Sequence, residues 1–174
     1  MPRTLESPLA ENRSAGITLS IVLWLLAAIA GAFVFWFVQS VSGGPTIPEF
    51  MGQQLVTAGG YRLVLAPAVG WMVHLGVSLS YAFLFAVIAL LLKPMRFAIR
   101  AAVTLIVAVA LGYLTTLIAP PAISVTVSLL SGHGWPRELF PLNRELGLPF
   151  WNHEGFFALN WGIQVVGPGL LRRS

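Results

Sequence analysis

The chain has 174 residues, of which 57% are hydrophobic and 9% are charged, and its formal net charge is +4. An ordinary soluble domain carries about 25% charged residues, and a chain of this size cannot bury so many apolar side chains in a core surrounded by water. The composition therefore excludes a soluble enzyme, a disordered segment and a nucleic-acid-binding domain, and it indicates a small all-α integral membrane protein.

Four stretches that lack Asp, Glu, Lys and Arg predict the membrane-spanning helices. A spanning helix needs about 20 predominantly apolar residues. Three stretches supply that length, and the fourth is short but qualifies if Trp151 or Asn152 begins the helix. We expect the third helix to stop before Pro120 and Pro121, because proline cannot donate the helical hydrogen bond. The sequence thus predicts a polytopic membrane protein, a bundle of four transmembrane helices within one integral-membrane domain (1–174), over approximately residues 17–38, 65–92, 97–118 and 153–171.

Two outer loops, residues 39–64 and 119–152, interrupt this predicted bundle. In the first loop, the segment between Gly43-Gly44-Pro45 and Gly59-Gly60 favours a short interfacial helix. In the second loop, residues 122–130 alternate apolar and polar side chains, a period typical of a strand. A lone strand leaves its backbone unpaired in lipid, so we expect a short helix at the outer surface, with a buried strand as the alternative.

The distribution of Lys and Arg predicts the orientation. When both termini lie in the cytoplasm, seven basic residues are inside and three outside, as the positive-inside rule requires. The apolar core of a signal peptide has about 7–15 residues, and the first apolar run of this chain is longer. We therefore expect an uncleaved anchor in the cell inner membrane. The basic residues predicted inside are Arg3, Arg13, Lys93, Arg96, Arg100, Arg172 and Arg173, and those outside are Arg62, Arg137 and Arg144.

His74 is the first candidate for a functional residue, because it lies within the second predicted span. Ionisable side chains in spans usually face the bundle interior. Gly70 and His74 form a Gly-x-x-x-His sequence that resembles the Ala-x-x-x-His pattern of light-harvesting polypeptides, and this resemblance implies a pigment or haem ligand. One alternative is a neutral histidine hydrogen-bonded to a Ser or Thr of a neighbouring helix. Another is a position with Asn160 and Gln164 on a path for protons or substrate.

The two remaining histidines, His133 and His153, are expected outside the membrane or at its surface. A haem held by two histidines of this chain is therefore disfavoured. His133, His153 and Glu154 do not show a metal-ligand spacing such as His-Glu-x-x-His, so we predict no metal site. The chain also lacks cysteine, a glycine-rich phosphate loop and a Gly-x-Ser-x-Gly motif. We therefore expect no catalytic residues.

The outer segment 131–155 gathers tryptophan and arginine, which are favoured anchors of protein interfaces. The leading hypothesis is a non-catalytic accessory or assembly subunit of a larger membrane complex, with the lipid bilayer and other membrane subunits as its partners. A homo-oligomeric transporter or channel, and a protein that binds a pigment or haem through His74, are the alternatives. The candidate partner contacts are Trp135, Arg137, Arg144, Trp151 and His153.

Small residues four positions apart let helices approach closely in lipid. Such faces either pack the bundle or dock it onto partners. The pairs are Ala28 and Ala32, Ala66 and Gly70, Ala82 and Ala86, and Ala108 and Gly112.

Overall fold

The computed structural model describes residues 8–171, with side chains for residues 16–169. Over that range the chain is helical and contains no strand, so the strand alternative for residues 122–130 is wrong. Three helices are long and apolar enough to cross a membrane, which supports a multi-pass membrane protein. The elements are α1 (Pro8–Val41), α2 (Ile47–Ala58), η1 (Leu63–Leu65), α3 (Ala66–Leu91), α4 (Phe97–Leu130), α5 (Leu148–Trp161), η2 (Gly162–Val166) and α6 (Gly167–Leu171).

Part of the predicted charge distribution cannot be placed in the fold. Arg3, Arg172 and Arg173 lie outside the described residues, as does the side chain of Arg13.

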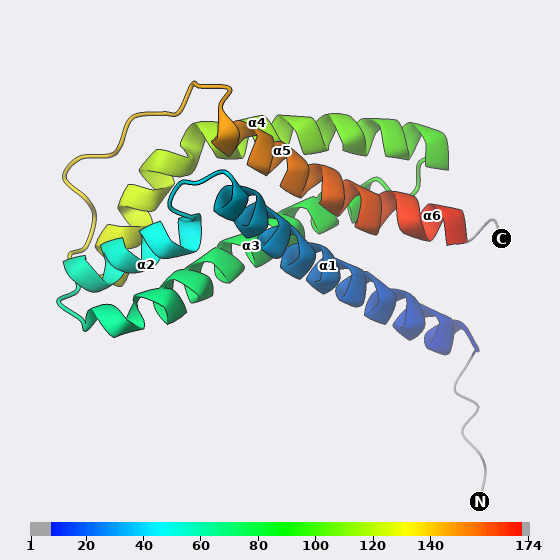
Figure 1. Cartoon of the computed structure of the whole chain (residues 1–174). Coiled ribbons are helices and arrows are strands. Elements are labelled where there is room, and N and C mark those ends of the chain that lie inside the picture. Colours follow the sequence, from blue (N-terminus) through cyan, green and yellow to red (C-terminus); the bar gives the residue numbers. More distant parts are fainter. Residues whose placement is uncertain (1–7, 172–174) are drawn as a thin grey trace, which may run out of the picture.

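The long helices are joined by tryptophan side chains that bond to neighbouring backbones. In Figure 1, α1 crosses α3, and α4 runs beside α5. The indole Nε1 of Trp24 on α1 donates to the carbonyl of Leu79 on α3 at 3.1 Å, and that of Trp161 on α5 donates to Ala101 on α4 at 3.0 Å. Each bond satisfies a buried indole donor while fixing the contact between two helices.

The predicted small-residue pairs pack the bundle. Seven of their eight residues are buried, and only Ala86 is half-buried. Larger side chains from α3 and α5 complete the core, among them Phe85, Phe156 and Phe157. These faces are therefore used within the chain and do not form free docking surfaces.

Helix α2 fills the first outer segment and begins with a capping box. The Thr46 hydroxyl accepts from the backbone N–H of Glu49, and the carboxylate of Glu49 accepts from the backbone N–H of Thr46 at 2.9 Å. The hydrogen bonds from the backbone and the hydroxyl of Thr46 hold the pKa of Glu49 below its usual range. The side chain of Gln39 at the end of α1 accepts from Ile47 N at 2.8 Å, which joins α1 to α2.

Helix α2 lies against α3 with the two backbones in direct contact. A Cβ atom on Gly52 would meet the carbonyl of Ala66, and one on Gly70 would meet the carbonyl of Pro48. Only glycine permits this approach, because backbone atoms cannot move aside as a flexible side chain can. The Ala66-x-x-x-Gly70 pair on α3 thus forms the surface against which α2 packs.

Helix α4 continues through Pro120 and Pro121 to Leu130, so the expected stop at residue 118 is wrong. Two adjacent prolines remove two helical donors, and Pro121 would otherwise have bonded the carbonyl of Leu117. That carbonyl accepts instead from the backbone N–H of Asn143 at 3.0 Å. A donor from the following loop therefore replaces the lost helical bond and lets the helix continue.

The same loop brings the chain back along α4. The backbone N–H of Phe140 donates to Ser124 Oγ at 2.9 Å, so residues 132–147 run beside the outer half of α4. Helix α5 then begins at Leu148 rather than near residue 153, with Pro149 in its first turn, where a missing N–H costs nothing. The ring of Phe150 meets that of Tyr113 on α4.

We predict that Gly70→Ala destabilises the fold and that Gly76→Ala does not. The added methyl at residue 70 meets the backbone of α2, an overpacking that typically costs about 1–3 kcal/mol. A Cβ at Gly76, on the same helix, has nothing within 4 Å. Thermal unfolding of both variants in one detergent, followed by circular dichroism, checks this. Equal unfolding temperatures for the two variants would contradict the close contact between α2 and α3.

Candidate functional site

His74 and His153 line the same cavity. The cavity has a volume of about 110 Å³ and lies between α1, α2, α3, α4 and α5. The ring of Phe35, from α1, packs edge-on against both imidazoles, with centroids 5.7 Å from His74 and 5.1 Å from His153. The remaining lining residues are mainly apolar: Ile47, Met51, Val73, Val77, Ser78, Tyr81, Ala119, Ala122, Ile123, Thr126 and Phe156.

Each imidazole is held by one hydrogen bond to a backbone carbonyl. His74 Nε2 lies 3.0 Å from the oxygen of Ala32, and His153 Nδ1 lies 2.7 Å from the oxygen of Pro149. A carbonyl oxygen only accepts, so these two nitrogens carry the protons. A neutral imidazole has one N–H and one lone pair, which leaves His74 Nδ1 and His153 Nε2 as acceptors. Among the described residues neither has a hydrogen-bond partner.

The position of His153 differs from the sequence-based expectation. His153 is only 9% exposed and lies one turn into α5, facing Phe35 and His74. The sequence analysis placed it outside the membrane or at its surface, as a candidate partner contact, whereas its side chain is buried here and lines the same cavity as His74. The cause is the early start of α5 at Leu148, which follows from the loop folding back along α4.

The site does not suit a flat macrocycle. The space beside Gly70 is filled by the backbone of α2, which contacts it through Pro48. Phe35 packs on both imidazole rings. The cavity of about 110 Å³ has room for a small group but not for a macrocycle. The residues present therefore fit a small polar group on an apolar molecule better than a pigment or haem.

The three residues considered as metal ligands, His133, His153 and Glu154, do not lie together. His133 is exposed and its Nδ1 lies 2.8 Å from Ser131 Oγ. His153 faces α1, whereas the neighbouring Glu154 packs over Gly112 on α4. Within residues 16–169, no group of three or more His, Asp or Glu side chains is arranged to hold a metal ion.

The other predicted partner contacts are at the surface. Trp135 and Trp151 are 70% and 65% exposed, and Arg137 and Arg144 are exposed as well. Trp151 stands in the first turn of α5, with its ring 5.0 Å from that of Phe150.

The residues proposed to line a transport path do not meet in one cavity. Asn160 is fully buried, donates to the carbonyl of Phe156 and accepts from Gln164 at 2.8 Å. Gln164 lines a separate cavity nearer α6. Asn160 of α5 and Gln164 of η2 therefore bond to each other within the bundle, and His74 belongs to a different site.

Sequence reasoning also missed other lining residues. Ser78 follows His74 by four residues and so lies on the same helical face, a spacing that was available to predict it. Phe35 is one of 11 phenylalanines, and nothing in the sequence distinguishes it from the others.

The chain matches no protein family, no curated protein and no solved structure at a significant level. The chemistry of the site is therefore inferred from its own contacts. The decisive contacts are the two carbonyl bonds, because they determine which imidazole nitrogens remain available to a ligand.

Proposed function

We propose that the protein resides in the cell inner membrane with four spans and both termini in the cytoplasm. The C-terminal helical run, α5 through η2 to α6, covers residues 148–171. At 1.5 Å per residue such a run is about 36 Å long, which exceeds a hydrocarbon core of about 30 Å. Figure 1 places α6 and the start of α1 at the same end of the molecule. Gly16, Lys93 and Pro168 line one cavity there, as four spans require.

A reporter fused after Ser174 tests this topology. We expect a reporter that works only in the cytoplasm to be active there, and a periplasmic reporter to be inactive. The matched control places the same reporters after Gly134, in the outer loop, where the activities should reverse. Periplasmic activity after Ser174 would contradict the fourth span.

We infer that the protein binds a lipid-soluble molecule that carries a hydroxyl group, without transforming it. Support comes from His74 and His153, which line one mainly apolar cavity and each of which keeps one acceptor nitrogen, Nδ1 in His74 and Nε2 in His153, when the other nitrogen donates to a carbonyl. A hydroxyl donor entering this cavity satisfies a polar group that is otherwise costly to bury. The apolar lining then surrounds the part of the molecule next to the hydroxyl group.

The hydrogen-bond partners of the two imidazoles favour a site that binds a molecule and does not catalyse its reaction. In catalytic dyads and triads a carboxylate stabilises the imidazolium that forms when histidine takes up a proton. Here backbone carbonyls occupy that position on both His74 and His153. Uncharged carbonyl oxygens orient the rings but give a developing charge less support.

We predict that 4-octylphenol binds the purified protein and that 4-octylanisole, which lacks the hydroxyl donor, binds about tenfold more weakly. A hydrogen bond lost in an apolar site costs about 1–1.5 kcal/mol, close to tenfold in affinity. Trp71 packs on the His74 ring with centroids 5.7 Å apart, so tryptophan fluorescence reports occupancy.

Variants locate the binding. His74→Leu and His153→Leu should each remove most of the preference for the phenol, whereas His133→Leu, at an exposed histidine, should leave it unchanged. Equal binding of phenol and anisole by the unmodified protein would overturn the proposed function.

A second function, accessory subunit of a membrane complex, is favoured by the exposed apolar side chains of the outer loop. Large apolar residues exposed together mark interaction sites, and tryptophan is a favoured interface anchor. We propose that another membrane protein docks on this loop. The exposed side chains concerned are Trp135, Leu139, Phe140, Leu142, Leu146 and Trp151.

We predict that Trp135→Ala and Trp151→Ala release the protein from its complex while Arg144→Ala has little effect. Truncating a buried interface tryptophan typically costs about 2 kcal/mol or more, and removing an exposed rim charge costs under about 1 kcal/mol. Native gels of membranes solubilised in mild detergent, with total protein measured in parallel, check this. If both tryptophan variants stay fully assembled, the loop is not the docking surface.

A further inference from the structure

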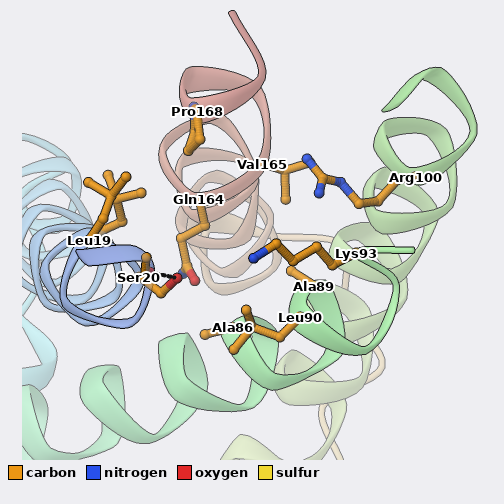
Figure 2. Close-up of a pocket in the computed structure, with 12 residues that line it drawn as sticks. Leu19, Ser20, Ala86, Ala89, Leu90, Lys93, Arg100, Gln164, Val165 and Pro168 are labelled. Carbon is orange, nitrogen blue, oxygen red and sulfur yellow. Dashed lines mark hydrogen bonds between the residues drawn. The ribbon is translucent and has the colours of Figure 1, made fainter. Parts of the chain in front are cut away.

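A second cavity lies at the opposite end of the bundle, near the start of α1. Its volume is about 80 Å³, and it is lined by α1, the end of α3, the first turn of α4, and η2 with α6. Lys93 and Arg100 are the two charged residues in its lining. Figure 2 shows Lys93, from the α3–α4 connection, and Arg100, from the first turn of α4, extending toward the C-terminal helix, with the Arg100 guanidinium beside Val165.

Among the described residues that line this cavity, the two cations have no negative partner. None of the described residues that line it is acidic. Arg100 Nε is buried and has no hydrogen-bond partner within the described part of the chain. The guanidinium of Arg100 lies over the ring of Phe97 at 5.8 Å, which restricts its position. A buried donor on a charged group is costly when unpaired, so this arrangement favours an anion as the missing acceptor.

The chemistry of the cavity matches a phosphate attached to an apolar chain. Arginine and lysine both donate charge-assisted hydrogen bonds to phosphate oxygens. Beside these donors, the wall formed by α1 and α3 is apolar, with Leu19, Leu23 and Leu90 among its residues. Basic pockets between transmembrane helices on the cytoplasmic side commonly bind anionic lipid headgroups.

We propose that Lys93 and Arg100 form a binding site for the phosphate headgroup of an anionic phospholipid, such as phosphatidylglycerol or cardiolipin. The headgroup phosphate accepts from Arg100 Nε and from the Lys93 amine. The acyl chains leave along the apolar side chains of α1 and α3. This site is independent of the histidine cavity, because the two cavities share no lining residue.

The test is native mass spectrometry of the delipidated protein titrated with phosphatidylglycerol, with phosphatidylcholine, or with inorganic phosphate. We expect the full-length protein to retain phosphatidylglycerol at least tenfold more tightly than phosphatidylcholine. Equal retention of the two lipids would overturn the proposal without the use of any variant. If inorganic phosphate saturates the site at concentrations comparable to those of the lipid, the site binds free phosphate and the proposed lipid headgroup is wrong.

Variants then locate the site. Lys93→Gln and Arg100→Gln should each reduce phosphatidylglycerol binding about tenfold. Arg96→Gln is the matched control, because it removes one charge from an exposed residue in the same connection that does not line the cavity. An equal loss with Arg96→Gln would show diffuse surface attraction and overturn the site. Lys93→Arg keeps the charge and should retain binding, which separates loss of the site from loss of the fold.

Discussion

The arrangement of α4, the loop 132–147 and α5 depends on one contact, the hydrogen bond from Asn143 N–H to the carbonyl of Leu117. A membrane protein must satisfy its backbone polar groups internally, and Pro121 leaves this carbonyl without its helical donor. The bond holds the loop against α4, so that α5 starts beside Tyr113 instead of at the outer end of α4. One consequence is that His153 is carried inward to Phe35 and His74.

The cavities at the two ends of the bundle are lined by different polar groups. One end holds two imidazoles bonded to carbonyls in an apolar cavity, with Phe35 between them. The other holds Lys93 and Arg100, whose cavity contains no acidic side chain among the described residues. A hydroxyl donor suits the first and an anion suits the second, so the bundle offers chemically distinct sites on either side of its core of alanine and phenylalanine.

Much of the fold follows from the sequence, because the absence of charge over about 20 residues is a strong criterion for a spanning helix. Four spanning helices were expected, and the described residues contain three helices long and apolar enough to cross a membrane. The continuation of α4 past Pro120 was not predictable, since it relies on Asn143, a donor 22 residues beyond Pro121. His74 was identified from its isolation in an apolar run. His153 was misplaced because local pattern does not reveal that a loop folds back along a helix.

The orientation of the two imidazoles is the central claim, and ¹⁵N NMR of the histidine-labelled protein in lipid nanodiscs tests it most directly. The ring nitrogen shifts distinguish the two neutral tautomers directly. We predict a proton on Nε2 of His74 and on Nδ1 of His153, because each of these nitrogens donates to a backbone carbonyl. A proton on the same nitrogen in both rings, or the mixed tautomers of an exposed histidine such as His133, would contradict the account.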